Sequence, residues 1–114
     1  MKVLAILLAF AGTLCAAPAT EKAASAMFEK SQYQEALAYY AKAAELPGEE
    51  GVRALYRAAE CEALLFRYAE AAQRLNAFKL PREPFWRARL LLLRAEAGRE
   101  YLRQYGYSLP TDVQ

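Results

Sequence analysis

Apolar side chains recur every three or four residues through most of this chain, which is the spacing of one face of an α-helix. The pattern is interrupted by residues that end helices or form turns, as at Pro47-Gly48 and Leu80-Pro81. Thr20, followed by Glu21, is a suitable N-cap for the first segment. The pattern predicts five helices, with approximate bounds 20–30, 33–46, 49–66, 68–78 and 84–105.

The composition of these segments points to the same fold class. Isoleucine is absent after residue 19, and valine occurs there only at Val52 and Val113. Alanine, leucine, glutamate and arginine dominate instead, and these residues favour helices, whereas β-branched residues favour strands. We therefore expect an all-α fold.

One short sequence pattern occurs twice. The pattern Y-x-E-A begins at Tyr33 and again at Tyr68, 35 residues later, and each copy is followed by a Leu-Pro pair, at 46–47 and 80–81. A period of this size in a helical sequence is typical of stacked helical repeats, in which no single unit can bury its apolar face alone.

The repeated segments resemble the tetratricopeptide repeat, a helix-turn-helix unit with a period of about 34 residues. Ala36 and Ala71 match the most regular alanine of that family, and Ala24 and Ala59 stand where the family usually has glycine. The tryptophan that the family carries early in each unit is absent here. The match is therefore better in the second helix of each unit than in the first.

The resemblance implies antiparallel helix-hairpin repeats in an α-solenoid with a C-terminal capping helix, within a domain of residues 20–106. Its parts are a repeat at about 20–47, a repeat at about 49–81 and an extra helix at about 84–105. The extra helix carries four successive leucines, Leu90–Leu93, which cover more than one helical face. Either this helix caps the array, or the array continues in a homo-oligomer or in a longer exported protein.

The first 19 residues differ from the rest. Lys2 supplies a positive charge, Val3–Leu14 is almost entirely apolar, and small residues follow as far as Ala19. This order is that of a secretory signal peptide, and we expect cleavage after Ala19, with Ala16 and Ala17 as alternatives. Residues 107–114 are expected to form a C-terminal tail.

The apolar run of this leader is shorter than the roughly 20 residues that a spanning helix needs. We therefore expect no stable membrane span after cleavage, with an uncleaved anchor as the alternative. Leu14 argues against a lipid on Cys15, because bacterial lipoproteins carry a small residue directly before the lipid-modified cysteine. The short apolar run and single lysine favour a bacterial protein, either periplasmic or secreted.

The sequence offers little for catalysis. It contains no histidine, which is the commonest general base and metal ligand. It has no glycine-rich phosphate loop and no nucleophile motif, so we expect no catalytic residues, no metal, no cofactor and no enzyme activity. With 15 basic and 13 acidic residues it also lacks the charge footprint of a nucleic-acid-binding protein. Cys61, the one cysteine after the leader, is expected to be a small buried residue.

In tetratricopeptide repeats the first helix of each unit lines a concave groove that accepts a peptide or a partner's helix. Carried over to this chain, the resemblance implies a binding groove formed by Phe28, Arg53, Tyr56, Glu60, Arg87, Leu90 and Arg94. Tyrosine and arginine are enriched at binding hot spots. The alternative for the charged members is that they form salt-linked rungs between neighbouring helices. Trp86 is expected in the core or at the end of the array.

The expected function is that of a non-enzymatic scaffold or adaptor, which binds a protein or peptide in the periplasm or cell envelope. The alternative is a structural N-terminal module of a larger exported protein or assembly. An adaptor is expected to expose a groove around Tyr56 and Leu90, whereas a module is expected to expose an apolar flank at Leu91–Leu93.

Overall fold

The computed structural model describes residues 17–106, and every regular element in that range is helical. The expected all-α class is therefore confirmed for this part of the chain. The expected tail, 107–114, and the expected signal peptide, apart from residues 17–19, lie outside the described residues. The helices are α2 (Glu21–Glu29), α3 (Tyr33–Ala43), α4 (Gly48–Leu64), α5 (Tyr68–Ala77) and α6 (Pro84–Gly106).

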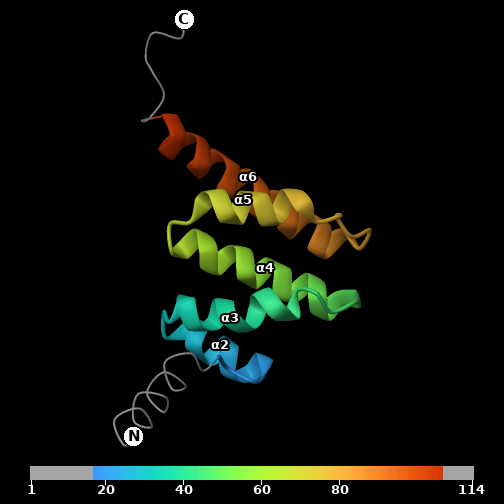
Figure 1. Cartoon of the computed structure of the whole chain (residues 1–114). Coiled ribbons are helices and arrows are strands. Elements are labelled where there is room, and N and C mark those ends of the chain that lie inside the picture. Colours follow the sequence, from blue (N-terminus) through green and yellow to red (C-terminus); the bar gives the residue numbers. More distant parts are fainter. Residues whose placement is uncertain (1–16, 107–114) are drawn as a thin grey trace, which may run out of the picture.

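Each helix contacts the next one along the chain, and α4 also contacts α6. Figure 1 shows that successive helices run in opposite directions and that α4 lies in the middle of the stack. The helices α2 and α3 lie on one side of α4, and α5 and α6 lie on the other.

The helix ends follow local hydrogen bonding. Thr20 caps α2 as expected, because its side-chain oxygen accepts a hydrogen bond from the Ala23 amide at 3.1 Å. The helix α3 ends at Ala43 rather than at the expected Leu46. The reason is that the amides of Glu45 and Leu46 donate to carbonyls three residues back, at 3.2 and 3.0 Å. Hydrogen bonds of this length along the chain form a 3₁₀-type turn, which ends the α-helix.

The turns that follow α2 and α4 have the same backbone geometry. Ser31 and Phe66 both adopt the left-handed conformation, with φ of 64° and 62°. The residue after each donates its amide to a carbonyl five residues back, at 2.8 Å in both turns. This hydrogen bond is that of the Schellman motif, and the two turns stand at the spacing of the sequence repeat. It also explains why α4 ends at Leu64, before the expected Phe66.

The buried side chains form two clusters, and α4 contributes to both. One face of α4 packs on α2 and α3, and the adjacent face packs on α5 and α6. Small side chains predominate at these contacts, which lets helix axes approach closely. The first cluster includes Ala24, Ala36, Tyr40, Ala54, Ala58 and Cys61. The second includes Leu55, Ala59, Ala71, Leu75, Leu90, Leu93 and Ala97.

The expectation for Cys61 is confirmed. Its side chain is completely buried between α4 and the first pair of helices. Burial raises the pKa of the Cys61 thiol to about 12, because a thiolate would lose its hydration there. The thiol therefore stays protonated at neutral pH and acts as a small apolar residue.

Gly51 permits a close backbone contact between α4 and the α3–α4 turn. A Cβ atom at this position would overlap the carbonyl oxygen of Leu46 and would lie 3.3 Å from that of Ala44. Both obstacles are backbone atoms, so no side-chain rotation can relieve the clash. The residue is buried in the first turns of α4, and only glycine fits there without moving the α3–α4 turn.

We therefore predict that Gly51→Ala lowers the free energy of unfolding by about 1–3 kcal/mol, the range for an overpacked site. Gly98→Ala is the matched control, because it is also helical and a Cβ there meets nothing within 4 Å. Gly98→Ala should stabilise the protein by about 0.5–1 kcal/mol. Urea unfolding followed by circular dichroism compares the two. A Gly51→Ala protein as stable as the parent would contradict the close contact.

One ion pair is largely buried between α4 and α5. Arg74 donates from Nε and Nη2 to the two carboxylate oxygens of Glu62, at 2.8 and 3.0 Å. The Glu62 side chain is only 6 % exposed, whereas that of Arg74 is 26 % exposed. This hydrogen bonding raises the pKa of Arg74, which keeps the guanidinium charged. The pair joins the end of α4 to the middle of α5.

Removal of one partner leaves the other charge buried and unpaired. We predict that Arg74→Leu costs about 3 kcal/mol of stability, the lower end for a buried pair because Arg74 is partly exposed. The double variant Glu62→Leu/Arg74→Leu should recover most of this loss, since two apolar groups need no partner. Chemical denaturation of both variants measures the coupling. A double variant less stable than Arg74→Leu would refute this explanation.

Candidate functional site

The side of the molecule formed by α2, α4 and α6 carries the contacts that join these three helices. Arg53 of α4 donates to the Glu21 carboxylate of α2, from Nε at 2.6 Å and from Nη2 at 3.1 Å. On the other flank, the Tyr56 ring of α4 meets the Trp86 ring of α6 edge to face, with centroids 5.9 Å apart. The structure separates the expected groove residues into three groups.

The members of the first group are engaged in contacts within the molecule. Arg53 bridges α2 and α4, as the salt-linked alternative predicts. Glu60 accepts a hydrogen bond from Arg57 at 2.9 Å along α4. The guanidinium of Arg57 lies 4.5 Å from the centroid of the Phe28 ring, which is half-buried. These side chains are held by contacts within the molecule.

One expected residue has to be corrected. Leu90 is only 2 % exposed and packs in the second core cluster, so it cannot form part of an accessible surface. At the 34-residue spacing of the repeat, Leu90 corresponds to Tyr56, but in the structure Leu90 and Leu93 face the core. The four leucines therefore divide: Leu91 and Leu92 are 38 % and 63 % exposed.

The other two expected residues of α6 are Arg87 and Arg94. Arg87 is exposed, and its Nη1 donates to the Pro81 carbonyl at 3.3 Å, which ties it to the loop before α6. Arg94 is half-buried, and it has no ion-pair partner within residues 17–106. Two other residues of α6, Trp86 and Arg89, contact the Tyr56 ring of α4, and neither was among the expected groove residues.

These two residues belong to a cluster of rings around one guanidinium. The Arg89 guanidinium carbon lies 4.9 Å from the centroid of the Phe85 ring, 5.2 Å from that of Tyr56 and 5.7 Å from that of Trp86. Phe85 and Trp86 meet edge to face at 5.2 Å. Each ring face attracts the cation, so the cluster holds Arg89 in place.

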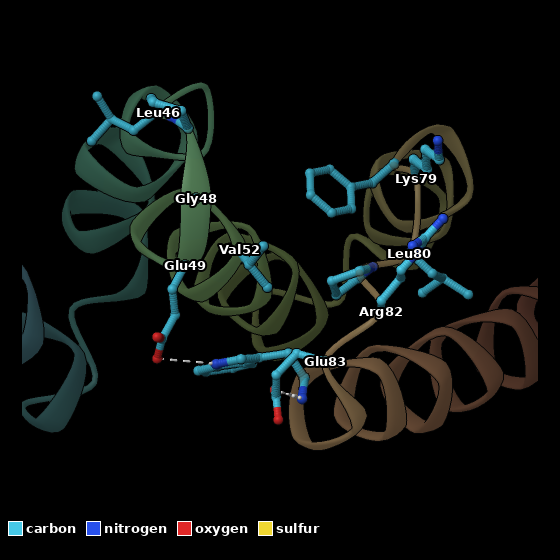
Figure 2. Close-up of a pocket in the computed structure, with 12 residues that line it drawn as sticks. Leu46, Gly48, Glu49, Val52, Lys79, Leu80, Arg82 and Glu83 are labelled. Carbon is cyan, nitrogen blue, oxygen red and sulfur yellow. Dashed lines mark hydrogen bonds between the residues drawn. The ribbon is translucent and has the colours of Figure 1, made fainter.

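Beside this cluster lies a hollow of about 640 Å³, between the α3–α4 turn and the α5–α6 loop. We call it the loop-end hollow. Its apolar lining is Leu46, Pro47, Val52, Phe78, Leu80, Pro81 and Trp86. Its charged residues are Glu49, Lys79, Arg82 and Glu83. Figure 2 shows Glu49 and Glu83 along one edge, with Lys79 and Arg82 on a separate part of the wall.

Two carboxylates fix the start of α6 at the edge of this hollow. Glu83 accepts hydrogen bonds from the Phe85 and Trp86 amides, at 3.0 and 2.9 Å, and so caps the helix. The Trp86 indole donates to the Glu49 carboxylate at 3.3 Å, which is shown as a dashed line in Figure 2. Pro84 follows Glu83 at the first helical position, where proline is favoured. Glu83-Pro84 was the signal that could have located this cap.

The lining of the loop-end hollow is mostly apolar, with four charged residues among its members. Within residues 17–106, no group of three or more cysteine, aspartate or glutamate side chains is placed to hold a metal ion. A hollow of this kind can accept an apolar side chain and leave the attached backbone in solvent.

No protein-family model, no curated protein and no solved structure matches this chain. The resemblance to tetratricopeptide repeats therefore stays a prediction from the sequence pattern. The structure adds that the two left-handed turns, at Ser31 and Phe66, repeat at the same spacing. Within residues 17–106, no helix combines the length and the apolar composition that a membrane crossing requires.

The Glu21–Arg53 pair gives a pH-dependent prediction. The hydrogen bond from Arg53 lowers the pKa of Glu21 in the folded protein. The pair therefore stabilises the fold fully at pH values above the ordinary pKa of glutamate. This contribution is lost as the pH falls through the lowered pKa. Because both side chains are about 40 % exposed, we expect Glu21→Gln to cost only about 0.2–1 kcal/mol at pH 7.

Thermal melts of the parent and of Glu21→Gln at pH 7 and at about pH 2 test this prediction. The acidic pH is chosen because it lies below the ordinary pKa range of carboxyl groups. The two proteins should differ at pH 7 and converge in acid. Glu29→Gln is the control, because Glu29 is exposed and has no ion pair within residues 17–106. An equal loss at both pH values would contradict the pair's contribution.

Proposed function

We propose that this protein is a non-enzymatic scaffold or adaptor of the tetratricopeptide-repeat type, which binds a peptide or helix of another protein. The loop-end hollow is the observation that carries the proposal. It is apolar, it is large enough for a side chain, and it adjoins aromatic and arginine side chains. Tryptophan, tyrosine and arginine around a desolvated hollow are the usual composition of a binding hot spot.

The proposed binding mode places one apolar side chain of the partner in the loop-end hollow, against Val52, Phe78 and Trp86. The partner's backbone then continues across the Tyr56–Arg89 cluster on the α2–α4–α6 side. Trp86 belongs to both regions, because it lines the hollow and contacts Tyr56. Relative to the groove expected from the sequence, the site moves toward the loops and replaces Leu90 with Trp86.

The proposed location is the bacterial periplasm or cell envelope. Its support is the sequence of the first 19 residues, which has a positive start, an apolar stretch and small residues before Ala19. An adaptor exported in this way meets its partner outside the cytoplasm. The proposed partner is a protein segment with an apolar anchor.

A second candidate is a structural module within a larger exported assembly. The observation that favours it is the exposure of apolar side chains on α6, since Leu92 and Leu102 are 63 % and 67 % exposed. The two candidates concern different surfaces. The adaptor uses the loop-end hollow, whereas a structural module uses the outer face of α6.

The sequence contains a single tryptophan, so the fluorescence of Trp86 reports on the loop-end hollow directly. We predict that peptides selected by phage display on the immobilised protein will carry an apolar anchor and will shift Trp86 emission on titration. Leu46→Lys places a charge at the edge of the hollow and should weaken these peptides at least about tenfold.

Leu64→Lys is the matched control, because Leu46 and Leu64 are 44 % and 43 % exposed and only Leu46 lines the hollow. It should leave the dissociation constant unchanged. Peptides that bind both variants equally, or that leave the emission of Trp86 unchanged, would show that the hollow is not the binding site.

A further inference from the structure

The last described helix, α6, has a second apolar face that contacts no other helix. Leu90, Leu93 and Ala97 are buried against α4 and α5. Arg99 lies nine residues beyond Leu90, which is two and a half turns, and therefore on the opposite side of the helix. The residues around Arg99 on that side are exposed, and they recur at regular intervals along the helix.

This exposed face repeats every seven residues. Phe85, Leu92 and Arg99 form one row, and Ala88, Ala95 and Leu102 form the other, so the spacing alternates between three and four. These are the a and d positions of a heptad pattern, the arrangement that pairs two helices along a seam. We call these six residues the outer seam. Phe85, Leu92 and Leu102 are each more than half exposed, at 54 %, 63 % and 67 %.

We propose that the outer seam binds the same seam of a second copy of this chain, with the two α6 helices antiparallel. The two faces of α6 then have different functions: the inner face completes the core of its own chain, and the outer seam joins two chains. This inference does not rest on the proposed peptide-binding function, because no residue of the outer seam lines the loop-end hollow, although Phe85 also belongs to the ring cluster around Arg89.

The size of the seam residues favours pairing with a second copy in the antiparallel direction. If the two-fold axis passes between residues 93 and 94, Leu92 of one copy faces Ala95 of the other. Arg99 then faces Ala88, and Phe85 faces Leu102. Two of these three layers set a large side chain against alanine, which lets the helices approach, and the long Arg99 side chain can extend its charge to solvent.

In this antiparallel register the charged residues beside the seam of one copy are complementary to those of the other copy. Arg89 and Glu96 occupy the same flanking position of successive heptads. In the antiparallel arrangement Arg89 of each copy lies beside Glu96 of the other, which gives two equivalent opposite-charge pairs. In the single chain the rings of Tyr56, Phe85 and Trp86 already hold the Arg89 guanidinium at this edge of α6.

The position of α6 leaves space for the second copy. Figure 1 shows α5 and α6 crossing at one end of the stack. Both helices that contact α6, namely α4 and α5, lie on its inner face. Two copies joined through the outer seam therefore place their other helices on opposite outer sides. The seam from Phe85 to Leu102 extends over roughly 26 Å, which is a small interface, so we expect dissociation in the micromolar range.

The test is sedimentation equilibrium of the protein from a bacterial host that exports it, with its N-terminus established by mass spectrometry. We expect a reversible monomer–dimer equilibrium between about 1 and about 200 µM. Leu92→Glu should raise the dissociation constant by about 100-fold, because both copies lose an apolar contact and gain a charge. Circular dichroism at low concentration should be unchanged, since Leu92 is exposed in the single chain.

Two further comparisons test the register. Ala95→Glu should also disrupt the dimer, whereas Ala26→Glu, an exposed alanine on α2 at the other end of the stack, should not. Arg89→Glu should weaken the dimer by about three- to tenfold through like charges, and Arg89→Glu/Glu96→Arg should restore it.

A parent protein that remains monomeric throughout this range would overturn the proposal. A dimer that is insensitive to Leu92→Glu would overturn it as well, because association would then use another surface. A dimer that responds to Leu92→Glu, but in which the charge reversal restores nothing, would overturn the antiparallel register.

Discussion

The fold depends on small side chains on two faces of a single helix. On one face of α4, Ala54, Ala58 and Cys61 let α2 and α3 pack closely, and on the adjacent face Ala59 does the same for α5 and α6. Alanine also has the highest helix propensity, so the residues that permit close packing favour α4 itself. Because α4 belongs to both clusters, neither pair of outer helices has a complete core without it. The Glu62–Arg74 pair and the Gly51 contact fix the two ends of the same helix.

The surfaces proposed for binding follow from how α6 meets this framework. Its N-terminus is fixed at the loop-end hollow by Glu83 and by the Trp86–Glu49 hydrogen bond, so the aromatic residues there are held in one arrangement. Further along, α6 has an inner face that completes the second cluster and an opposite outer seam. An adaptor with one hollow per chain, joined through such an antiparallel seam, would present two binding sites at opposite ends of the seam. Two sites on one particle can bind a repeated or oligomeric partner more tightly than either site alone.

The sequence was sufficient for features set by local rules. The five helices, the Thr20 cap and the buried Cys61 follow from apolar spacing, capping preference and residue size. The site was predicted less well, because it depends on the rotation of α6 about its axis. Leu90 aligns with Tyr56 in the repeat, yet it is buried because four successive leucines allow either face of α6 to turn inward. The contact of Arg89 with three rings from two helices could not be inferred from spacing, since it depends on the tertiary position of α6.

The claim that α4 holds two otherwise incomplete cores together is tested most directly by native-state hydrogen exchange, followed by mass spectrometry. The amides of α4 between Ala54 and Glu62 should exchange most slowly and only through global unfolding, while α2 and the end of α6 exchange earlier. All helices should lose their last protection together with α4, in a single cooperative step. Protection that persists in α5 and α6 after α4 has exchanged would contradict the account, because it would show that these helices form a stable unit without α4.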